Sequence, residues 1–180
     1  TRVPNSTGES DSMNPPGTPD TAPPSDSPPA TGNTPEAIAA TIRTAMEQVP
    51  FGRWLGLTFT GFDDERVLLH FRMRDEFVGN PTRNALHGGI IAAVLDTVGG
   101  LAAFRGILAR EPAVARGSPA SPWLSTIDLR TDYLRPGTGD EFTASAFPLR
   151  VGSRLVVIRM ELHGASGDLV AVGTGTYAVP

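Results

Sequence analysis

The spacing of hydrophobic residues changes several times along the chain, and each change marks a predicted element. Between positions 35 and 49, apolar residues recur every three to four places, which predicts a helix capped by Thr34 with Pro35 at its first position. Residues 54–64 and 66–74 are rich in β-branched and aromatic residues around an acidic turn, which predicts a hairpin. Residues 75–86 contain Gly, Asn and Pro and predict a loop.

The second half of the chain begins with its longest apolar stretch. Residues 88–108 predict a helix that is buried over most of its surface, followed by a loop at 109–122. Four strand-like runs come next, at 123–134, 139–150, 153–164 and 168–180, separated by turns that contain Gly, Pro or Asp. This order of elements predicts an α+β fold, with a mostly antiparallel six-stranded sheet wrapped around the long central helix.

Residues 1–34 have a different composition from the rest. They are mostly Pro, Ser, Thr, Gly, Asn and Asp without an aromatic residue, so they bury too little apolar area to offset the entropy of ordering. We therefore expect a disordered N-terminal tail and one folded domain over 35–180. The tail lacks the apolar core of a signal peptide, and the chain lacks cysteine, which together favour a cytoplasmic location.

Charge narrows the range of partners. The net charge is −4, and the tail, with one arginine against four acidic residues, accounts for −3 of it. A nearly neutral domain argues against nucleic acid as a main partner. The best candidate for a membrane span, at 88–104, is short and contains Asp96, so no membrane insertion is expected. The absence of cysteine excludes a thiolate nucleophile, and no metal or cofactor is expected.

Asp96 is the one carboxylate in "NALHGGIIAAVLDTVGGLAAF" (84–104). A buried acid is unfavourable unless it is paired or used. It lies eight residues after Gly88, about 12 Å along a helix axis, whereas the free amides at a helix start favour an anion or a polarised carbonyl oxygen. One small reacting group cannot contact both features of its own chain. It could contact the helix start of one chain and Asp96 of another, if the two helices ran antiparallel in a two-fold dimer.

Gly99 and Gly100 fall inside the same predicted helix, although each glycine there destabilises it by about 1 kcal/mol relative to alanine. Small residues let another backbone approach closely. Two interpretations remain open: close packing of the helix on the sheet, and close approach of a second copy of the helix.

Three separated motifs resemble one family. "LHGGIIAAVLD", in which His-Gly-Gly begins nine residues before Asp, "STIDLRTDYLRP" and "GDLVAVGTGTYAV" together resemble the hotdog-fold acyl-CoA thioesterases of the PaaI-like, phenylacetate-pathway type, over residues 50–179. The resemblance implies a hotdog fold, dimers with two active sites at their interface, and further pairing into tetramers. It also implies hydrolysis of acyl-CoA thioesters to free acid and CoA.

The resemblance further implies roles for single residues. Asp96 would be the nucleophile or general base, and the backbone N–H of Gly88 in the partner, with Gly89 as a second candidate, would polarise the thioester carbonyl. His87 would position this loop or assist near the carbonyl, and Thr126 would orient the attacking water. The residues expected to hold the pantetheine and phosphates of CoA are Tyr133, Arg135, Pro136, Gly137, Gly152, Ser153 and Arg154.

The chain departs from the family pattern at one position. Six residues before the histidine the family often has Asn or Gln, where this chain has Pro81; a loop longer by one residue would let Asn80 serve as a further catalytic residue. Apolar residues that could line an acyl pocket, and that favour medium-chain or aryl acyl groups, are Phe51, Trp54, Phe77, Val78 and Leu86.

Other classes of function fit less well. The chain has neither the G-x-S-x-G of α/β-hydrolases nor a phosphate-binding P-loop. A non-catalytic acyl-CoA-binding hotdog module is the main alternative, and it would have no need of a carboxylate at the thioester. The sequence leaves open the acyl specificity, CoA against acyl-carrier-protein thioesters, dimer against tetramer, and a nucleophilic against a general-base role of Asp96.

Overall fold

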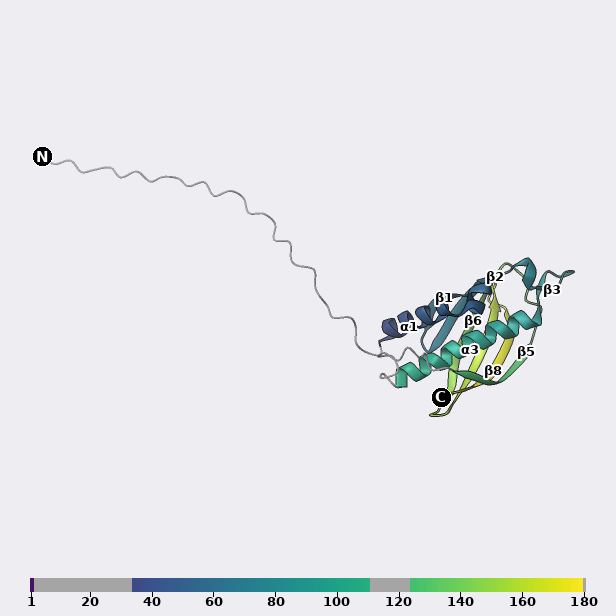
Figure 1. Ribbon diagram of the computed structural model, residues 1–180. Coiled ribbons are helices and arrows are strands. Elements are labelled where there is room, and N and C mark those ends of the chain that lie inside the picture. The colour runs from purple at the N-terminus through teal and green to yellow at the C-terminus, as the bar shows by residue number, and fades with distance from the viewer. Residues whose placement is uncertain (2–33, 111–123, 180) are drawn as a thin grey trace.

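The computed structural model describes residues 1, 34–110 and 124–179 (Figure 1). Residues 2–33 of the tail predicted at 1–34, and nearly all of the loop predicted at 109–122, lie outside the described residues. The first helix, α1 (Pro35–Gln48), begins as predicted, because Thr34 Oγ1 accepts the N–H of Ala37 at 3.2 Å and Pro35 occupies the first turn. Its buried side, which includes Ile38 and Ile42, joins the core.

A six-stranded antiparallel sheet forms the body of the domain, in the order β1-β2-β6-β7-β8-β5. Its strands are β1 (Thr58–Asp63), β2 (Arg66–Arg72), β5 (Ser125–Tyr133), β6 (Glu141–Val151), β7 (Leu155–Gly164) and β8 (Leu169–Ala178). One long helix, α3 (Gly88–Arg110), lies across one face of this sheet (Figure 1). The predicted α+β architecture, a hotdog fold with the sheet wrapped around the central helix, is confirmed.

The core lies between α3 and the inner face of the sheet. The alternation of buried and less buried residues along β7 shows that every second side chain points at the helix, as the pleat of a strand requires. On α3, Val94, Leu95, Val98 and Ala102 are fully buried. By length and composition alone α3 could span a membrane, but core helices of globular domains share these properties, and its apolar side packs on the sheet.

Two segments differ from the sequence-based expectation. The strand expected from residue 54 begins only at Thr58, because Pro50 starts a second short helix, α2 (Pro50–Trp54). Proline ends a preceding helix but fits the first position of the next one. The predicted loop at 75–86 contains a 3₁₀ turn, η1 (Asp75–Phe77), and a small hairpin of β3 (Val78–Asn80) and β4 (Ala85–Leu86). This hairpin leads the chain into the start of α3.

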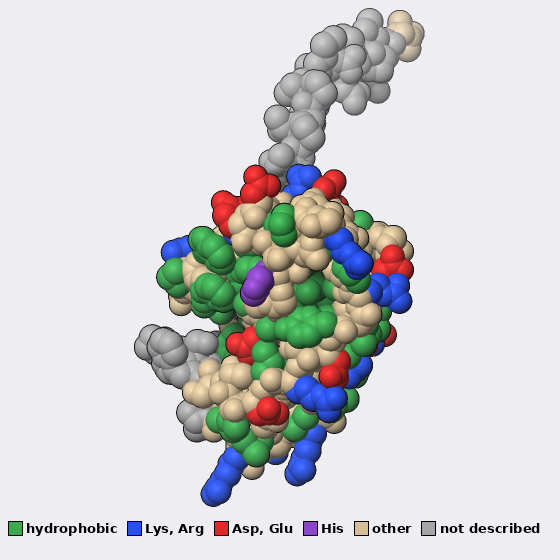
Figure 2. Space-filling model, turned by 90° about the vertical axis from the view of Figure 1, so that its right-hand side faces the viewer, with side chains coloured by type: hydrophobic (Ala, Val, Ile, Leu, Met, Phe, Trp, Pro, Cys, Tyr) green, Lys and Arg blue, Asp and Glu red, His purple; other side chains and the backbone are tan. Residues whose placement is uncertain are grey.

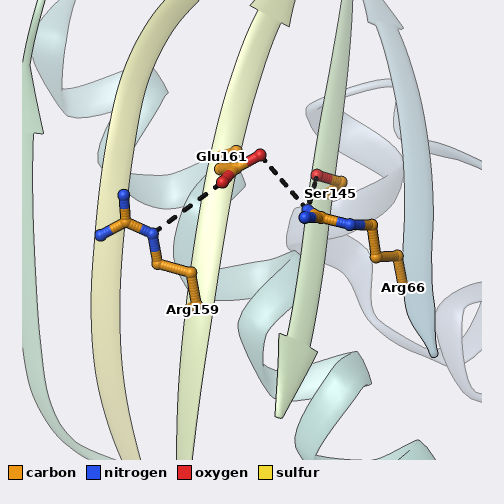
Figure 3. A network of polar contacts seen from close by, with 4 residues as sticks. All are labelled: Arg66, Ser145, Arg159 and Glu161. Carbon is orange, nitrogen blue, oxygen red and sulfur yellow. Dashed lines mark hydrogen bonds and ion pairs between the residues drawn. The ribbon is translucent and has the colours of Figure 1, made fainter. Parts of the chain in front are cut away.

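The outer face of the sheet carries a network of polar side chains. Arg66 on β2 contacts Ser145 on β6 at 3.4 Å and Glu161 on β7 at 3.3 Å, while Arg159 lies 4.0 Å from the same Glu161 (Figure 3). Their strand neighbours on the inner face, such as Met160, belong to the core. This network therefore lies on the opposite side of the sheet from α3 and from the residues of the predicted site.

Candidate active site

Asp96 lies in the middle of α3, at the side of the helix that faces β5 and β8. Its carboxylate Oδ1 accepts the hydroxyl of Thr126 at 3.0 Å and the hydroxyl of Tyr177 at 3.3 Å. The Tyr177 hydroxyl also lies 3.1 Å from the backbone carbonyl oxygen of Asp96. Within the described part of the chain, no group donates to the second carboxylate oxygen, Oδ2. We call Asp96, Thr126 and Tyr177 the carboxylate half-site.

An irregularity in β5 accompanies the contact between Thr126 and Asp96. The pairing of β5 with β8 shifts between Thr126 and Asp128, so that Thr126 pairs with Tyr177 while Ile127 is an extra residue. Bulges of this kind redirect side chains and are common beside active sites. The structure thus brings together Asp96 and Thr126, two residues that the sequence analysis assigned to one site.

Tyr177 was missed by the sequence analysis. It is only 1% exposed, and burial together with the negative charge of Asp96 raises its pKa well above the ordinary tyrosine value. The hydroxyl therefore keeps its proton and acts as a donor. One sequence signal could have revealed it: in "GTGTYAV" the residues Gly173, Gly175 and Tyr177 share one face of β8, and Gly175 leaves room for the large ring two positions further on.

The start of α3 forms a second cluster. The Nδ1 atom of His87 accepts the N–H of Gly89 at 2.9 Å, and its carbonyl accepts the N–H groups of Ile90 and Ile91, so His87 is the N-cap of the helix. Among the described residues, no group accepts the N–H of Gly88. Of the two backbone N–H groups predicted to polarise the thioester carbonyl, that of Gly88 is therefore the one still available to a substrate. We call His87, Gly88 and Gly89 the helix-start half-site.

Tyr133 covers the helix start from β5. Its hydroxyl donates to the carbonyl oxygen of Gly88 at 3.0 Å. Beside it lies a pocket of about 420 Å³ lined by Leu86, Gly88, Ile91, Tyr133, Leu134, Arg135, Pro136 and Gly137. Four residues predicted to bind CoA thus lie next to the available Gly88 amide. Figure 2 views the molecule from this end, where hydrophobic side chains gather and charged ones lie mainly around them.

A second pocket, of about 450 Å³, continues from the first one. Both pockets include Arg135 and Pro136, and the second adds Arg83, which the sequence analysis did not single out. Arg135 forms an ion pair with Asp168 at 2.9 Å, and both side chains are about half exposed. This pocket therefore presents two guanidinium groups at the surface, one of them partly neutralised.

The remaining predicted residues lie elsewhere. Gly152, Ser153 and Arg154 form the turn between β6 and β7, near the far end of α3, where Arg110 donates to the Val151 carbonyl at 3.1 Å. In a single chain they are separated from Gly88 by roughly the length of α3, about 33 Å.

Asn80 is also placed apart from the carboxylate half-site. Its side-chain oxygen accepts the N–H of Arg83 at 3.3 Å, which ties Asn80 into the turn between β3 and β4. The structure shows it in a local contact and does not bring it to Asp96. No group of three potential metal ligands occurs among the residues that the structure describes.

The two half-sites lie on one helix, about 12 Å apart along its axis. A carboxylate held by hydroxyls and an open helix amide, on the central helix of a wrapped antiparallel sheet, define a hotdog protein suited to attack on an acyl carbonyl. The chain belongs to the thioesterase superfamily, whose family model matches residues 84–171.

Two relatives are similar over most of the chain. The medium/long-chain acyl-CoA thioesterase YigI of Escherichia coli K12 is 38% identical over 133 residues, which are 73% of this chain and 86% of YigI. A crystal structure of a Shewanella oneidensis protein related to the thioesterase superfamily is 39% identical and has a TM-score of 0.71, covering 82% of this chain and all of the other.

The expected PaaI-like type is supported at the level of the fold alone. The E. coli PaaI structure has a TM-score of 0.65 over 82% of this chain and 96% of PaaI, but the sequences are 21% identical. The family is therefore the thioesterase superfamily, and PaaI is a distant structural neighbour of this chain.

Proposed function

We propose that this protein hydrolyses acyl-CoA thioesters to the free acid and CoA. The observation that carries the proposal is the Asp96 carboxylate, which two hydroxyls hold at one oxygen while the other remains open. A module that only binds acyl-CoA has no need of such a group. The similarity to a medium/long-chain acyl-CoA thioesterase supports CoA as the carrier and an acyl chain of that length.

The chemistry follows from the two half-sites. As a general base, Asp96 takes a proton from water, the water oxygen bonds to the acyl carbon, and the carbon–sulfur bond breaks as CoA leaves as the thiol after gaining a proton. As a nucleophile, Asp96 itself bonds to the acyl carbon, the carbon–sulfur bond breaks, and CoA leaves as the thiol after gaining a proton. Water then hydrolyses the resulting anhydride, which releases the free acid and regenerates the Asp96 carboxylate. In both routes the Gly88 N–H stabilises the negative charge that develops on the carbonyl oxygen.

A two-fold dimer with antiparallel α3 helices completes each site. Strand β5 ends the sheet order, and Ile127, Tyr133 and Leu134 at this edge are each more than half exposed. A long open edge strand is a template for pairing with another chain. On the accessible side of α3, the residues three and four positions from Asp96 include the small residues Ala92, Ala93 and Gly100. A second copy would cover both surfaces, and pairing of dimers into tetramers is a further step of the same proposal.

The antiparallel dimer also gives the turn at 152–154 a possible role in binding CoA. Arg110 lies 14 residues after Asp96, about 21 Å further along the helix. In an antiparallel pair, the partner's turn at 152–154 therefore lies beyond the partner's Asp96, on the side where this chain's helix begins. An acyl-CoA whose thioester carbonyl is at Gly88 could extend over the pocket at Arg135. Its phosphates would then lie near Arg83 of the same chain or Arg154 of the partner subunit.

An apolar surface beside the helix start suits the acyl chain. Phe51 and Trp54, both 51% exposed, stack with ring centroids 6.0 Å apart, and Trp54 packs on Phe77 at 5.7 Å. The Phe77 carbonyl accepts the N–H of His87 at 2.7 Å, so this aromatic row adjoins the helix-start half-site. Its exposure supports medium or long acyl groups. The cytoplasm remains the proposed location, supported by the lack of cysteine.

Release of free thiol from acyl-CoAs of two to sixteen carbons tests the proposed reaction. We expect release that is greatest for medium or long chains and that is lost in Asp96→Asn. Parallel assays with acyl-carrier-protein thioesters separate the two carriers. Binding of acyl-CoA without release from any of them would contradict the proposal and favour the binding module.

Mixing two inactive variants tests the shared site. Asp96→Asn and Gly88→Pro, which removes the amide hydrogen, each disable both sites of their own homodimer. After random reassociation, half of the dimers are mixed, and each mixed dimer has one intact site, so about a quarter of the wild-type activity returns. A mixture that stays inactive, although mass spectrometry shows mixed dimers, would contradict the shared site.

A further inference from the structure

The Tyr177 hydroxyl reaches the carboxylate half-site from inside the core. The side chain comes from β8, is 1% exposed, and touches Asp96 at two atoms, the backbone carbonyl oxygen at 3.1 Å and Oδ1 at 3.3 Å. Met160 Sδ lies 3.8 Å from the same hydroxyl. A buried hydroxyl could simply be satisfied by the backbone carbonyl, so the additional approach to the carboxylate calls for an explanation.

The space for this ring is made by glycines on two elements. A Cβ at Gly99 of α3 would collide with the Tyr177 hydroxyl and lie 2.6 Å from Met160 Sδ, and a Cβ at Gly175 of β8 would lie 3.2 Å from the ring. The close approach at Gly99 is therefore that of helix to sheet, which answers one of the two interpretations left open by the sequence. Because position 99 is a glycine, the Tyr177 hydroxyl has the space to reach the helix.

We propose that Tyr177 is a positioning residue for hydrolysis, which together with Thr126 fixes Oδ1 of Asp96 and turns Oδ2 toward the reacting water or carbonyl. Thr126 donates from β5 on one side and Tyr177 from β8 on the other. Two donors at one oxygen restrict both side-chain torsions of Asp96. The single hydroxyl hydrogen of Tyr177 is shared between Oδ1 and the Asp96 carbonyl oxygen, and the contact to the carbonyl ties the donor to the helix backbone.

The ionisation of Tyr177 is consistent with this role. Burial and the charge of Asp96 raise its pKa, so the hydroxyl remains a neutral donor well above neutral pH. A hydroxyl that keeps its proton can donate to a carboxylate, which is the form of Asp96 that either proposed mechanism uses. The inference rests on the proposed function, because positioning has meaning only for a reacting carboxylate.

Tyr177→Phe tests the inference, because it removes the hydroxyl and keeps the ring. A hydrogen bond to a charged group contributes about 1.5–3 kcal/mol, so we expect kcat to fall roughly 10- to 100-fold while KM stays within about twofold. A residue that merely fills the core would change the melting temperature and leave kcat in place.

Met160→Leu is the matched control, because it changes the packing on the same hydroxyl and leaves both contacts to Asp96. We expect it to keep the wild-type kcat and KM. Tyr177→Phe and Thr126→Ala should be non-additive in kcat, as both donors act on one oxygen. Gly99→Ala, which displaces the hydroxyl from the helix side, should reproduce the kinetic signature of Tyr177→Phe.

Two outcomes separate this inference from the proposed function. An active wild type, with a folded Tyr177→Phe variant of unchanged kcat, would overturn the positioning role alone. A wild type that releases thiol from no thioester would overturn the proposed function, and the inference with it.

Discussion

The two half-sites of this domain use different kinds of chemical group: side chains in one and a backbone amide in the other. The carboxylate half-site consists of side chains from three elements, and one of them, Tyr177, is rooted in the core. The helix-start half-site depends on a backbone amide at the surface, capped by His87 and covered by Tyr133. Packing therefore sets the geometry of the first, whereas the geometry of a helix end sets that of the second.

This difference determines which substitutions each half-site tolerates. At the carboxylate half-site, exchange of a single atom changes the chemistry without changing the shape. At the helix start, a change matters only if it removes the amide hydrogen or shifts the helix end. Four tests, ordered by expected effect, examine this contrast.

Asp96→Asn should have the largest effect. It keeps the shape of the side chain and can still accept from Thr126, but it removes the base or nucleophile, so kcat should fall by about 10²–10⁴. Thiol release under saturating acyl-CoA measures it, with circular dichroism to confirm the fold. A variant with wild-type kcat would show that Asp96 is structural.

Gly88→Pro should follow, with Gly88→Ala as its control. Proline fits the first helical position but has no N–H, and loss of one oxyanion donor typically lowers kcat by about 10²–10³. Alanine keeps the N–H, and its Cβ would meet the Tyr133 ring at an ordinary 3.4 Å. Kinetics of the two variants side by side measure the contribution of the amide. Equal losses in both would indicate a steric effect and contradict the oxyanion role.

The third test compares stability at high pH. Because the pKa of Tyr177 is raised in the folded state, its contribution is complete below the unfolded pKa of about 10 and decreases as the pH rises above it, by up to about 1.4 kcal/mol per pH unit. Tyr177→Phe should therefore lose less stability above pH 10 than the wild type. The chain has no lysine or cysteine, which leaves few other groups to titrate there. Urea unfolding between pH 8 and 11 measures the difference, and parallel curves would contradict it.

His87 should give the smallest effect. If its ring acts as a helix cap, His87→Ala lowers the free energy of unfolding by about 1 kcal/mol. Asparagine also caps helices well, so His87→Asn should restore most of the stability. Thermal unfolding measures both variants. Restored stability with a large loss of kcat in His87→Asn would show that the imidazole takes part near the carbonyl.

The sequence predicted the parts of this molecule that depend on periodicity and short-range motifs. The central helix, the six strands and the cap at Thr34 follow from spacing, and Asp96 stands out because it interrupts an apolar stretch. Short helix α2 was missed because a proline that ends one helix also begins another. Its five residues are too few to show a helical period.

The contacts that depend on tertiary packing were beyond sequence reasoning. The approach of Tyr177 to Asp96 joins residues 81 positions apart. The sequence also could not show that the Gly89 N–H already has an acceptor. The Nδ1 atom of His87 accepts this N–H in the side-chain conformation that the histidine adopts in the folded protein. The sequence motif identifies the N–H groups of Gly88 and Gly89 as candidate donors, and the folded structure shows that the one at Gly88 remains available.

The open edge of β5 has a consequence for how activity responds to the amount of protein. When each working centre needs two chains, the number of centres follows the law of mass action for self-association. Dilution below the dissociation constant of the pair would then lower specific activity while each chain stays folded. Total activity would rise more steeply than protein concentration at low expression. The specific activity would become constant once nearly every chain is part of a dimer.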